Sequence, residues 1–414
     1  MLFKESIKRF TPPKGWSWAS IGDVAKLSFS SVDKKSVEGE NVVRLCNYMD
    51  VFYNRRIREG MPFMVSTASE SDIKKFTLNK GDVILTKDSE TPEEIAFAAV
   101  IDEQIENLVC GYHLAVLRPD KAKVTGEYLM SAINFYPNHH QFVRLANGAT
   151  RFGLGIDSLN NALLPLPSLA EQRKIAEILR TWDEAIETAE AELKAKQERK
   201  RWLAETVLSG SVRVKGHKTA WDKKRLDQIG KIVPGGTPST SIPEYWNGDV
   251  PWVTPTEITK LKTPYIHITE SLITSEGVRN SSAALLPVDS LIVCTRATVG
   301  VCAINKVPMT TNQGFKSIVP ESTDDTLFLY YVLNSMQSTF NRLAQGSTFL
   351  EISKTQFEKM TIIWPEAEER RQIASLMRTA DEQTEKIAER IESLRTQKRG
   401  LMQKLLTGEV RVAA

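Results

Sequence analysis

The chain has 414 residues, of which 41% are hydrophobic, and its 54 basic and 51 acidic residues leave a formal net charge of +3. This length suggests roughly two to four domains with buried cores, and such a balanced charge does not by itself indicate a nucleic-acid-binding protein. The longest apolar run, Ile95 to Ile101, is far too short to span a bilayer.

The N-terminal segment and the cysteines indicate a cellular compartment. Residues 1–10 lack the apolar region of a signal peptide. The four cysteines, Cys46, Cys110, Cys294 and Cys302, show neither metal-ligand spacing nor paired redox spacing, so we expect buried free thiols in a reducing compartment. We therefore expect a cytoplasmic protein without a membrane partner.

Residues 1–165 form the first predicted domain, of mixed α+β type. Short β-branched runs at Asp82–Thr86 and Leu114–Leu117 lie between Gly/Pro turns and predict strands. Basic clusters at Asn54–Arg58 and Lys74–Lys75 could meet phosphates, although an ordinary solvated surface explains them equally well.

Residues 166–210 form a predicted long helix that spans 168–208. Ser168 and Glu171 make a capping-box pattern at its start, and Gly210 is a stop signal at its end. About 40 residues at 1.5 Å each predict a rod of roughly 60 Å. Alternating three- and four-residue steps place a seam of residues on one side, at Leu179, Trp182, Ile186, Ala189, Leu193, Leu203 and Val207.

Residues 211–363 form the second predicted domain, and residues 364–414 form a second long helix, over 366–406, with a C-terminal tail. Strands are predicted at Ser290–Cys294 and Phe315–Val319, and Lys260 and Lys262 are further candidate phosphate ligands. The second helix ends before Gly408, and its seam consists of Met377, Ala380, Thr384, Ile387, Ile391, Leu394, Leu401 and Leu405.

The two helical segments are copies of one another. Residues 167–214 realign without a gap on residues 365–412, with 18 of 48 positions identical, and Lys200 and Lys398 occupy the same polar seam position. Two matched apolar stripes favour a mutual coiled coil over packing of each helix on its own domain. Outside the helices the heads correspond only loosely, for example at Trp16 and Trp221, so we expect one scaffold with different loops.

A search for catalytic machinery finds no convincing motif. The Gly235–Pro238 turn lacks the Lys and the helix that a phosphate-binding loop requires, and the glycines of Phe152–Gly155 are mis-spaced for a methyl-donor loop. The five histidines show no zinc-binding spacing. We therefore expect no catalytic residue, no metal and no cofactor in this chain.

Several motifs carry a resemblance to a known family. They are Gly235–Pro238 followed by Pro243–Val253, then Thr295–Gly300, Thr311–Phe315 and Gln345–Thr348, and Pro167 with Glu171–Ile175 at the first helix. In this order, and with the tandem duplication, the chain resembles the specificity subunits of type I restriction-modification enzymes. The first half departs from the pattern, with Lys87-Asp88-Ser89 where the second half has Thr295-Arg296.

The resemblance implies an α+β fold with two target-recognition domains on two long antiparallel helices. Each head would read one half of a split, asymmetric DNA target, and the coiled coil would fix the spacer between the halves. The chain would dock two adenine methyltransferase subunits, which would be joined by restriction subunits that translocate DNA. S-adenosylmethionine, ATP and Mg would belong to those partners.

The resemblance also selects DNA-facing candidates, because Arg, Lys, Asn, Gln and Thr side chains read base edges in the major groove. In the second head they are Thr237, Ser239, Thr254, Thr256, Lys260, Lys262, Arg296, Asn312 and Lys316. In the first head they are Arg55, Arg56, Arg58, Lys74, Lys75, Lys87 and Arg151. Some of these side chains, especially Asn312 and Thr237, could instead close turns.

Two alternatives stay open at the level of sequence. The first is the recognition subunit of a related system in which nuclease and methyltransferase are fused, and only co-purifying chains would separate it. The second is a duplicated scaffold that binds proteins and no DNA. A salt-dependent shift on mixed duplex DNA is expected for a phosphate-binding protein and not for a scaffold.

Overall fold

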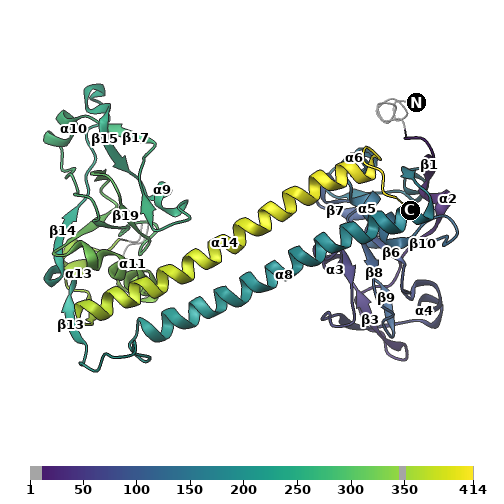
Figure 1. Ribbon diagram of the computed structural model, residues 1–414, viewed down its shortest axis with the longest axis horizontal. Helices are drawn as coiled ribbons and strands as arrows, with labels where there is room; N and C mark the ends of the chain where they lie inside the picture. The colour runs from purple at the N-terminus through teal and green to yellow at the C-terminus, as the bar shows by residue number, and fades with distance from the viewer. Residues whose placement is uncertain (1–11, 345–350, 414) are drawn as a thin grey trace. The chain divides into compact units, whose positions relative to one another are not determined.

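The computed structural model describes residues 12–344 and 351–413. They belong to two compact units, Met1–Ala189 with Arg390–Ala414 and Glu190–Glu389. Both unit boundaries fall inside the two long helices, α8 (Leu169–Val207) and α14 (Ala367–Leu406), as labelled in Figure 1. Each unit therefore contains one head and part of each helix. The predicted helix limits, 168–208 and 366–406, are confirmed to within one residue.

The head of the first unit is built on a five-stranded sheet. Its strand order is β2 (Ala25–Phe29), β10 (Leu114–Pro119), β6 (Val83–Thr86), β8 (Ala98–Ile101) and β4 (Arg56–Ile57). A second sheet has the order β5 (Met64–Ala68), β3 (Asn41–Cys46), β9 (Leu108–Cys110), and two small pairs are β1 (Ser17–Ser20) with β12 (Leu163–Leu166) and β7 (Asp88–Ser89) with β11 (Phe152–Gly153). Its short helices are α2 (Ile21–Val24), α3 (Tyr48–Tyr53), α4 (Glu70–Phe76), η1 (Pro92–Glu94), α5 (Gly126–Asn134), α6 (Tyr136–Leu145) and α7 (Ile156–Asn160).

The head of the second unit has the same plan. Its five-stranded sheet has the order β14 (Gly230–Pro234), β21 (Lys316–Pro320), β18 (Leu291–Val293), β19 (Cys302–Asn305) and β16 (Tyr265–Ile266). The three-stranded sheet has the order β17 (Ser271–Ile273), β15 (Trp246–Val253), β20 (Thr310–Thr311), and β13 (Asp222–Arg225) pairs with β22 (Thr361–Trp364). Its short helices are η2 (Leu226–Gln228), η3 (Pro243–Tyr245), α9 (Pro255–Thr259), α10 (Ser275–Arg279), η4 (Thr323–Asp325), α11 (Thr326–Ser335), α12 (Gln337–Leu343) and α13 (Lys354–Glu358).

The two heads therefore share a topology that their sequences barely reveal. In both five-stranded sheets the first four strands pair antiparallel and the short last strand, β4 or β16, pairs parallel with its neighbour. The four strands predicted from β-branched runs are confirmed as β6, β10, β18 and β21. The expectation of one scaffold filled with different loops is thus confirmed.

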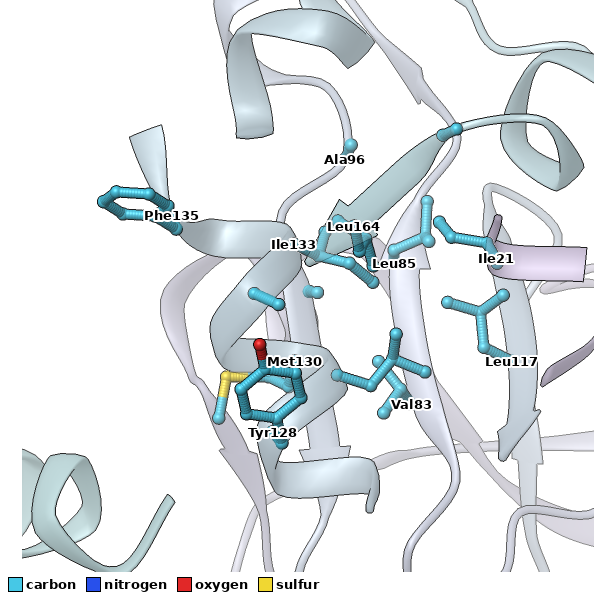
Figure 2. Close-up of a cluster of buried hydrophobic side chains, with 14 of the residues drawn as sticks. Ile21, Val83, Leu85, Ala96, Leu117, Tyr128, Met130, Ile133, Phe135 and Leu164 are labelled. Carbon is cyan, nitrogen blue, oxygen red and sulfur yellow. The ribbon is translucent and has the colours of Figure 1, made fainter. Parts of the chain in front are cut away.

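Successive side chains of the central strands point to opposite faces of the sheet, and apolar side chains are buried on both faces. In β6, Val83 and Leu85 enter one apolar cluster and Ile84 enters the other, as expected for successive side chains of a strand. Figure 2 shows Val83 and Leu85 with Tyr128 of α5 in the first of these clusters. Burial of each such aliphatic side chain contributes about 1.5–3 kcal/mol to folding.

The long helices enter the cores of the heads. Ile175 and Leu179, near the start of α8, and Leu405, near the end of α14, lie in the core of the first head. Val207, at the end of α8, and Met377, near the start of α14, lie in the core of the second head. Each head therefore stands on the beginning of one long helix and the end of the other.

The pairing of side chains shows that the helices run antiparallel within each unit. In the first unit Lys398 pairs with Asp183 and Arg411 pairs with Glu171. Residue numbers therefore rise along α14 as they fall along α8. In the second unit Lys200 pairs with Asp381, and Lys196 donates to Gln383. All predicted seam residues are buried or half-buried, which confirms the heptad pattern.

The ends of the long helices are built alike in the two units. Gly210 and Gly408 both adopt positive φ, at 75° and 71°, so both predicted stop signals are confirmed. At the start of α8 the Ser168 hydroxyl accepts from the Glu171 N–H at 3.3 Å. The Glu171 carboxylate, which the capping box would direct to Ser168, accepts from Trp16 Nε1 at 2.9 Å and pairs with Arg411. The sequence pattern at Ser168 was therefore only half a capping box.

Two further expectations can be compared with the structure. Cys46, Cys110, Cys294 and Cys302 are free and buried, as expected from their spacing. Across residues 12–344 and 351–413, no helix combines the length and the apolar character needed to cross a membrane.

Candidate nucleic-acid interface

Four loops of the second head meet at one place. The Gly235 N–H donates to Phe315 O at 3.1 Å, and the Gly236 N–H donates to Thr311 O at 2.8 Å. The Asn312 N–H donates to Val253 O at 3.1 Å, next to the start of α9. The Thr295 N–H donates to Gly314 O at 2.8 Å. Three sequence motifs that are distant along the chain, at 235–238, 295–300 and 311–315, thus form one loop cluster, whereas the Gln345–Thr348 motif lies outside the described residues.

The paired glycines are required by the closeness of this packing. A Cβ atom on Gly235 would lie 1.8 Å from the Asn312 carbonyl oxygen, and one on Gly236 would lie 2.3 Å from the Ala283 backbone nitrogen. Trp252 Nε1 also donates to the Gly236 carbonyl at 2.9 Å. Any side chain at either glycine would push this loop away from the cluster.

Three candidate side chains of this cluster serve local structure. The Thr254 hydroxyl donates to Glu257 at 2.7 Å and so closes the first turn of α9. Asn312 Oδ1 accepts from the Gly314 N–H at 2.9 Å, which closes the turn before β21. The Thr237 hydroxyl donates to the exposed Gln313. The alternative that a candidate side chain closes a turn is confirmed for Asn312, and Thr254 has the same role, whereas Thr237 bonds a side chain of another loop.

Arg296 emerges from a tightly determined segment. Its backbone forms an antiparallel bridge with Glu351, and the Ile352 N–H donates to Thr295 O at 2.9 Å. The next residue, Ala297, has φ of 63°, a left-handed conformation that costs free energy in a residue with a side chain. The half-buried Arg296 side chain is therefore presented by backbone that its surroundings hold in place.

Lys316 lies beneath this segment and not on the surface. It is 6% exposed, and its ammonium group donates to Thr295 Oγ1 at 3.1 Å and to Glu351 Oε1 at 3.4 Å. Burial lowers the pKa of Lys316, while Glu351 acts against this shift. The structure therefore places Lys316 inside the head, where Thr295 and Glu351 already satisfy its charge, and not at the surface where the predicted contact with DNA would require it.

The remaining candidates of the second head are surface residues. Ser239, Thr256, Lys260 and Lys262 are exposed, and Lys260 Nζ lies 3.6 Å from Glu270. Gln313 is exposed at the tip of the 311–315 loop and was not selected from the sequence, although it lies within a quoted motif. A glutamine at such a tip has the donor and acceptor needed to read adenine.

The first head brings a different set together at its own loops. Lys87, 8% exposed, donates to Asp88 at 2.8 Å and lies 4.8 Å from the centre of the Tyr112 ring. Asp88 Oδ2 lies 3.1 Å from His113 Nδ1, and the exposed Arg151 has Nη2 3.3 Å from the same nitrogen. Burial raises the pKa of Asp88, but the bonds to Lys87 and His113 outweigh it and leave the pKa lowered.

Lys87 is therefore buried and paired with Asp88, and it does not lie at the surface where the predicted contact with DNA would require it. His113 and Asp88 were not selected from the sequence, although Asp88 lies in the quoted stretch Lys87-Asp88-Ser89. Lys74 and Lys75 are exposed in the last turn of α4, as a phosphate ligand requires.

The basic cluster at 55–58 packs against α8. The Arg56 side chain is 2% exposed and bonds Asp102 at 3.2 Å and Glu127 at 3.1 Å. Arg58 bonds Asp102 at 3.1 Å and Glu187 of α8 at 2.8 Å. Burial lowers the pKa of the half-buried Arg55, and the charge of Asp183 opposes this shift. The charge of Arg56 is therefore taken up by two acids and Arg58 is bonded to α8, so neither side chain lies free at the surface as the predicted contact with DNA would require.

The described part of the chain offers no evident metal site, since no group of three or more His, Cys, Asp and Glu side chains within it could hold a metal ion. The polar groups that converge in the two loop clusters are donors and acceptors suited to binding. They do not form a pair of nucleophile and base that would indicate chemistry.

Comparison with known proteins places these features in one family. The model of the type I restriction modification DNA specificity domain matches residues 13–197 and again residues 218–396. The type I restriction enzyme MjaIX specificity subunit of Methanocaldococcus jannaschii is 36% identical over 164 residues, which are 39% of this chain and 38% of that relative. The HindI specificity subunit of Haemophilus influenzae is 24% identical over 431 residues, covering 85% of this chain and 90% of the relative.

A solved structure has the same fold. The S subunit of a type I restriction-modification system from M. genitalium superposes with a TM-score of 0.59 at 14% identity, over 94% of this chain and 96% of that one. The double match of the family model agrees with the duplicated topology of the two heads.

Proposed function

The chain belongs to the type I restriction-modification DNA specificity family, and from that premise we propose that it reads a split, asymmetric duplex DNA target. Residues 1–165 and 211–363 act as the two target-recognition domains. Residues 166–210 and 364–414 form the spacer helices and the C-terminal tail. The chain itself performs no catalysis.

One observation favours this proposal over the alternatives. The two heads have the same strand order, yet they present different side chains at the corresponding loops. The first head has Arg151 beside His113, and the second has Arg296 and Gln313. A shared frame with different polar tips suits the reading of two different sequences, since base edges are distinguished by the arrangement of donors and acceptors.

The DNA-facing set consists of exposed side chains, together with the half-buried Arg296, whose backbone is held in the loop cluster by the bridge to Glu351. In the second head it comprises Ser239, Thr256, Lys260, Lys262, Arg296 and Gln313, and in the first head it comprises Lys74, Lys75 and Arg151. Lysines contact phosphates, and the arginines and Gln313 contact bases. Thr237, Thr254 and Asn312 hold the loops that carry them.

The antiparallel helices set the distance between the two readers. A helix of about 40 residues is roughly 60 Å long, and half-sites one DNA turn apart are separated by about 34 Å. A pair of helices of this length is long enough to carry two heads along one face of a duplex. The non-specific spacer of the target would then be fixed by the coiled coil.

Catalysis belongs to partners. Two adenine methyltransferase subunits dock on the chain, and they bind S-adenosylmethionine and extrude the target adenine. Restriction subunits that use ATP and Mg join for cleavage. We place this complex in the cytoplasm, where four free cysteines stay reduced.

The test uses the purified chain with and without its methyltransferase partner. We expect the chain alone to show no methylation and no calorimetric binding of S-adenosylmethionine, and the mixture to methylate adenines at one bipartite sequence. Binding of mixed duplex DNA should weaken steeply with salt. Salt-insensitive behaviour, or no binding at all, would favour a protein scaffold, and a co-purifying fused nuclease-methyltransferase would favour the related system.

A further inference from the structure

Each head places a buried lysine against a carboxylate at the base of its arginine-bearing loop. In the second head, Lys316 bonds Glu351 and Thr295, and Glu351 faces Arg296 across a backbone bridge. In the first head, Lys87 bonds Asp88, which bonds His113, whose ring adjoins Arg151. These residues are the arginine supports of the two heads.

In both heads the arginine and the carboxylate of the support lie on two paired backbone segments, but their order along the chain is reversed. In the first head the carboxylate is on the earlier segment, at Asp88 in β7, and the arginine precedes β11, which pairs with β7. In the second head the arginine is on the earlier segment, at Arg296, and the carboxylate is on the later one, at Glu351. Two different sequences thus bring an arginine, a carboxylate and a buried lysine to one place in the fold.

Burial explains why these lysines are not phosphate ligands. The side chains of Lys87 and Lys316 are 11% and 7% exposed, and both ammonium groups already have acceptors in the head. Extracting such a charge for a phosphate would break the bonds of Lys316 to Thr295 and Glu351, or the bond of Lys87 to Asp88, and would take the lysine stem out of the head. A bidentate contact from arginine to guanine, by contrast, depends on a backbone held to within about 0.5 Å.

We propose that Lys316 and Lys87 are positioning residues for base readout, which fix Arg296 and Arg151 in the orientation that contacts a base. The inference rests on the proposed function and adds to it the residues that determine specificity. Lys316 ties Thr295 and Glu351, the two neighbours of Arg296 in the bridge. Lys87 fixes Asp88, and through it the His113 ring that adjoins Arg151.

The experiment uses the full chain in complex with its methyltransferase and S-adenosylmethionine. Methylation rates are measured on duplexes in which every base of the target is replaced in turn. Lys316→Met should relax discrimination about tenfold at one position of one half-target. Arg296→Ala should relax the same position, and the double variant should add nothing there. Lys87→Met and Arg151→Ala should do the same at one position of the other half.

Salt dependence separates positioning from phosphate contact. The logarithmic salt slope of binding should be unchanged in Lys316→Met, whereas the exposed control Lys260→Met should lose about one unit of slope on all sequences alike. Glu351→Gln is the second variant, because its half-exposed side chain can lose charge without disturbing the core. It should relax the same position as Lys316→Met.

Unchanged base preference in both Lys316→Met and Glu351→Gln would overturn the inference. So would a salt slope that falls in Lys316→Met as it does in Lys260→Met. A wild-type complex that methylates no specific sequence would instead refute the proposed function, and with it this inference.

Discussion

Glu171 and Glu369 occupy equivalent places at the starts of the two long helices. Glu369, with no exposed side-chain area, accepts from Trp221 Nε1 at 2.7 Å and pairs with Arg213 at 2.6 Å. Glu171 makes the same contacts with Trp16 and Arg411. Burial raises the pKa of both carboxyl groups, but the bonds from arginine and tryptophan outweigh it and leave each pKa lowered.

This geometry predicts a pH-dependent loss of stability in Glu369→Gln. Hydrogen bonds to a charged group contribute about 1.5–3 kcal/mol, so we expect the variant to unfold at lower urea concentration at pH 7. The folded pKa lies below the unfolded value, so the unfolded chain takes up the proton first as the pH falls. The stabilisation is therefore full above about pH 4.3 and is lost as the pH falls through the lowered folded pKa.

Urea unfolding of both proteins between pH 7 and pH 3 checks this prediction. The difference in unfolding free energy should shrink towards acid pH. The exposed Glu192→Gln serves as the matched control and should show no difference at either end. A gap between wild type and Glu369→Gln that stays constant over the whole range would contradict the proposed role of the charge.

At this scale the sequence predicted residue types better than residue roles. Arg56 was chosen because it lies in a basic run, but its acidic partners Asp102 and Glu127 come from distant positions that no local pattern reveals. Asn312 and Thr254 were chosen as DNA-facing candidates and lie in the loop cluster, yet their side chains close turns there. Exposure and pairing depend on tertiary contacts, and these decide which polar side chain is available to a ligand.

The long helices were predictable because their signals are local. The start signals, the glycine stop signals and the heptad steps all lie within or next to the helical segments. The observed limits differ from the predicted ones by one residue at most. The loop clusters lack such signals. The contacts of Gly235 with Asn312 and of Thr295 with Gly314 join segments that only the folded sheet brings together.

The seam predicts a sharp difference between buried and exposed helix positions. Ile391 is 4% exposed within the first unit, so Ile391→Asp buries a charge without a partner and should lower the melting temperature clearly. Glu192→Lys changes charge by two units at an exposed position and should melt as the wild type does. Thermal unfolding followed by circular dichroism measures both, and equal melting of the two variants would remove the coiled-coil account.

The ion pair between Lys398 and Asp183 predicts non-additive stability effects. Both side chains are about nine-tenths buried, and burial lowers the pKa of Lys398. Lys398→Met alone leaves Asp183 without this partner and should cost about 3 kcal/mol or more. Lys398→Met with Asp183→Leu removes both charges and should recover most of that loss.

A double-mutant cycle by urea unfolding measures this coupling. The cycle compares the wild type, Lys398→Met, Asp183→Leu and the double variant. We expect the effects of the two single variants not to add. The matched cycle on the exposed residues Lys194 and Glu198 should give a coupling energy near zero. Simple addition of the two single effects at Lys398 and Asp183 would show that the pair contributes nothing as a pair.

The whole chain is a duplication in which the strand orders are repeated and the side chains of the loops differ. The same strand orders recur in both heads, as do the Trp–Glu–Arg groups and the Lys–Asp pairs at the helices. The helical part of this repeat is visible in the sequence, since both helices conserve their spacing. The repeat of the heads is nearly invisible, because insertions in the loops shift the matching positions.

The central claim is that each head reads its own half of the target on a shared spacer. The most direct measurement replaces residues 211 to 350 with the matching head of a relative and maps the methylated adenines of the resulting complex by sequencing. The account predicts that one half of the bipartite motif changes, while the other half and the spacer length stay the same. A change in both halves, or in the spacer, would contradict it.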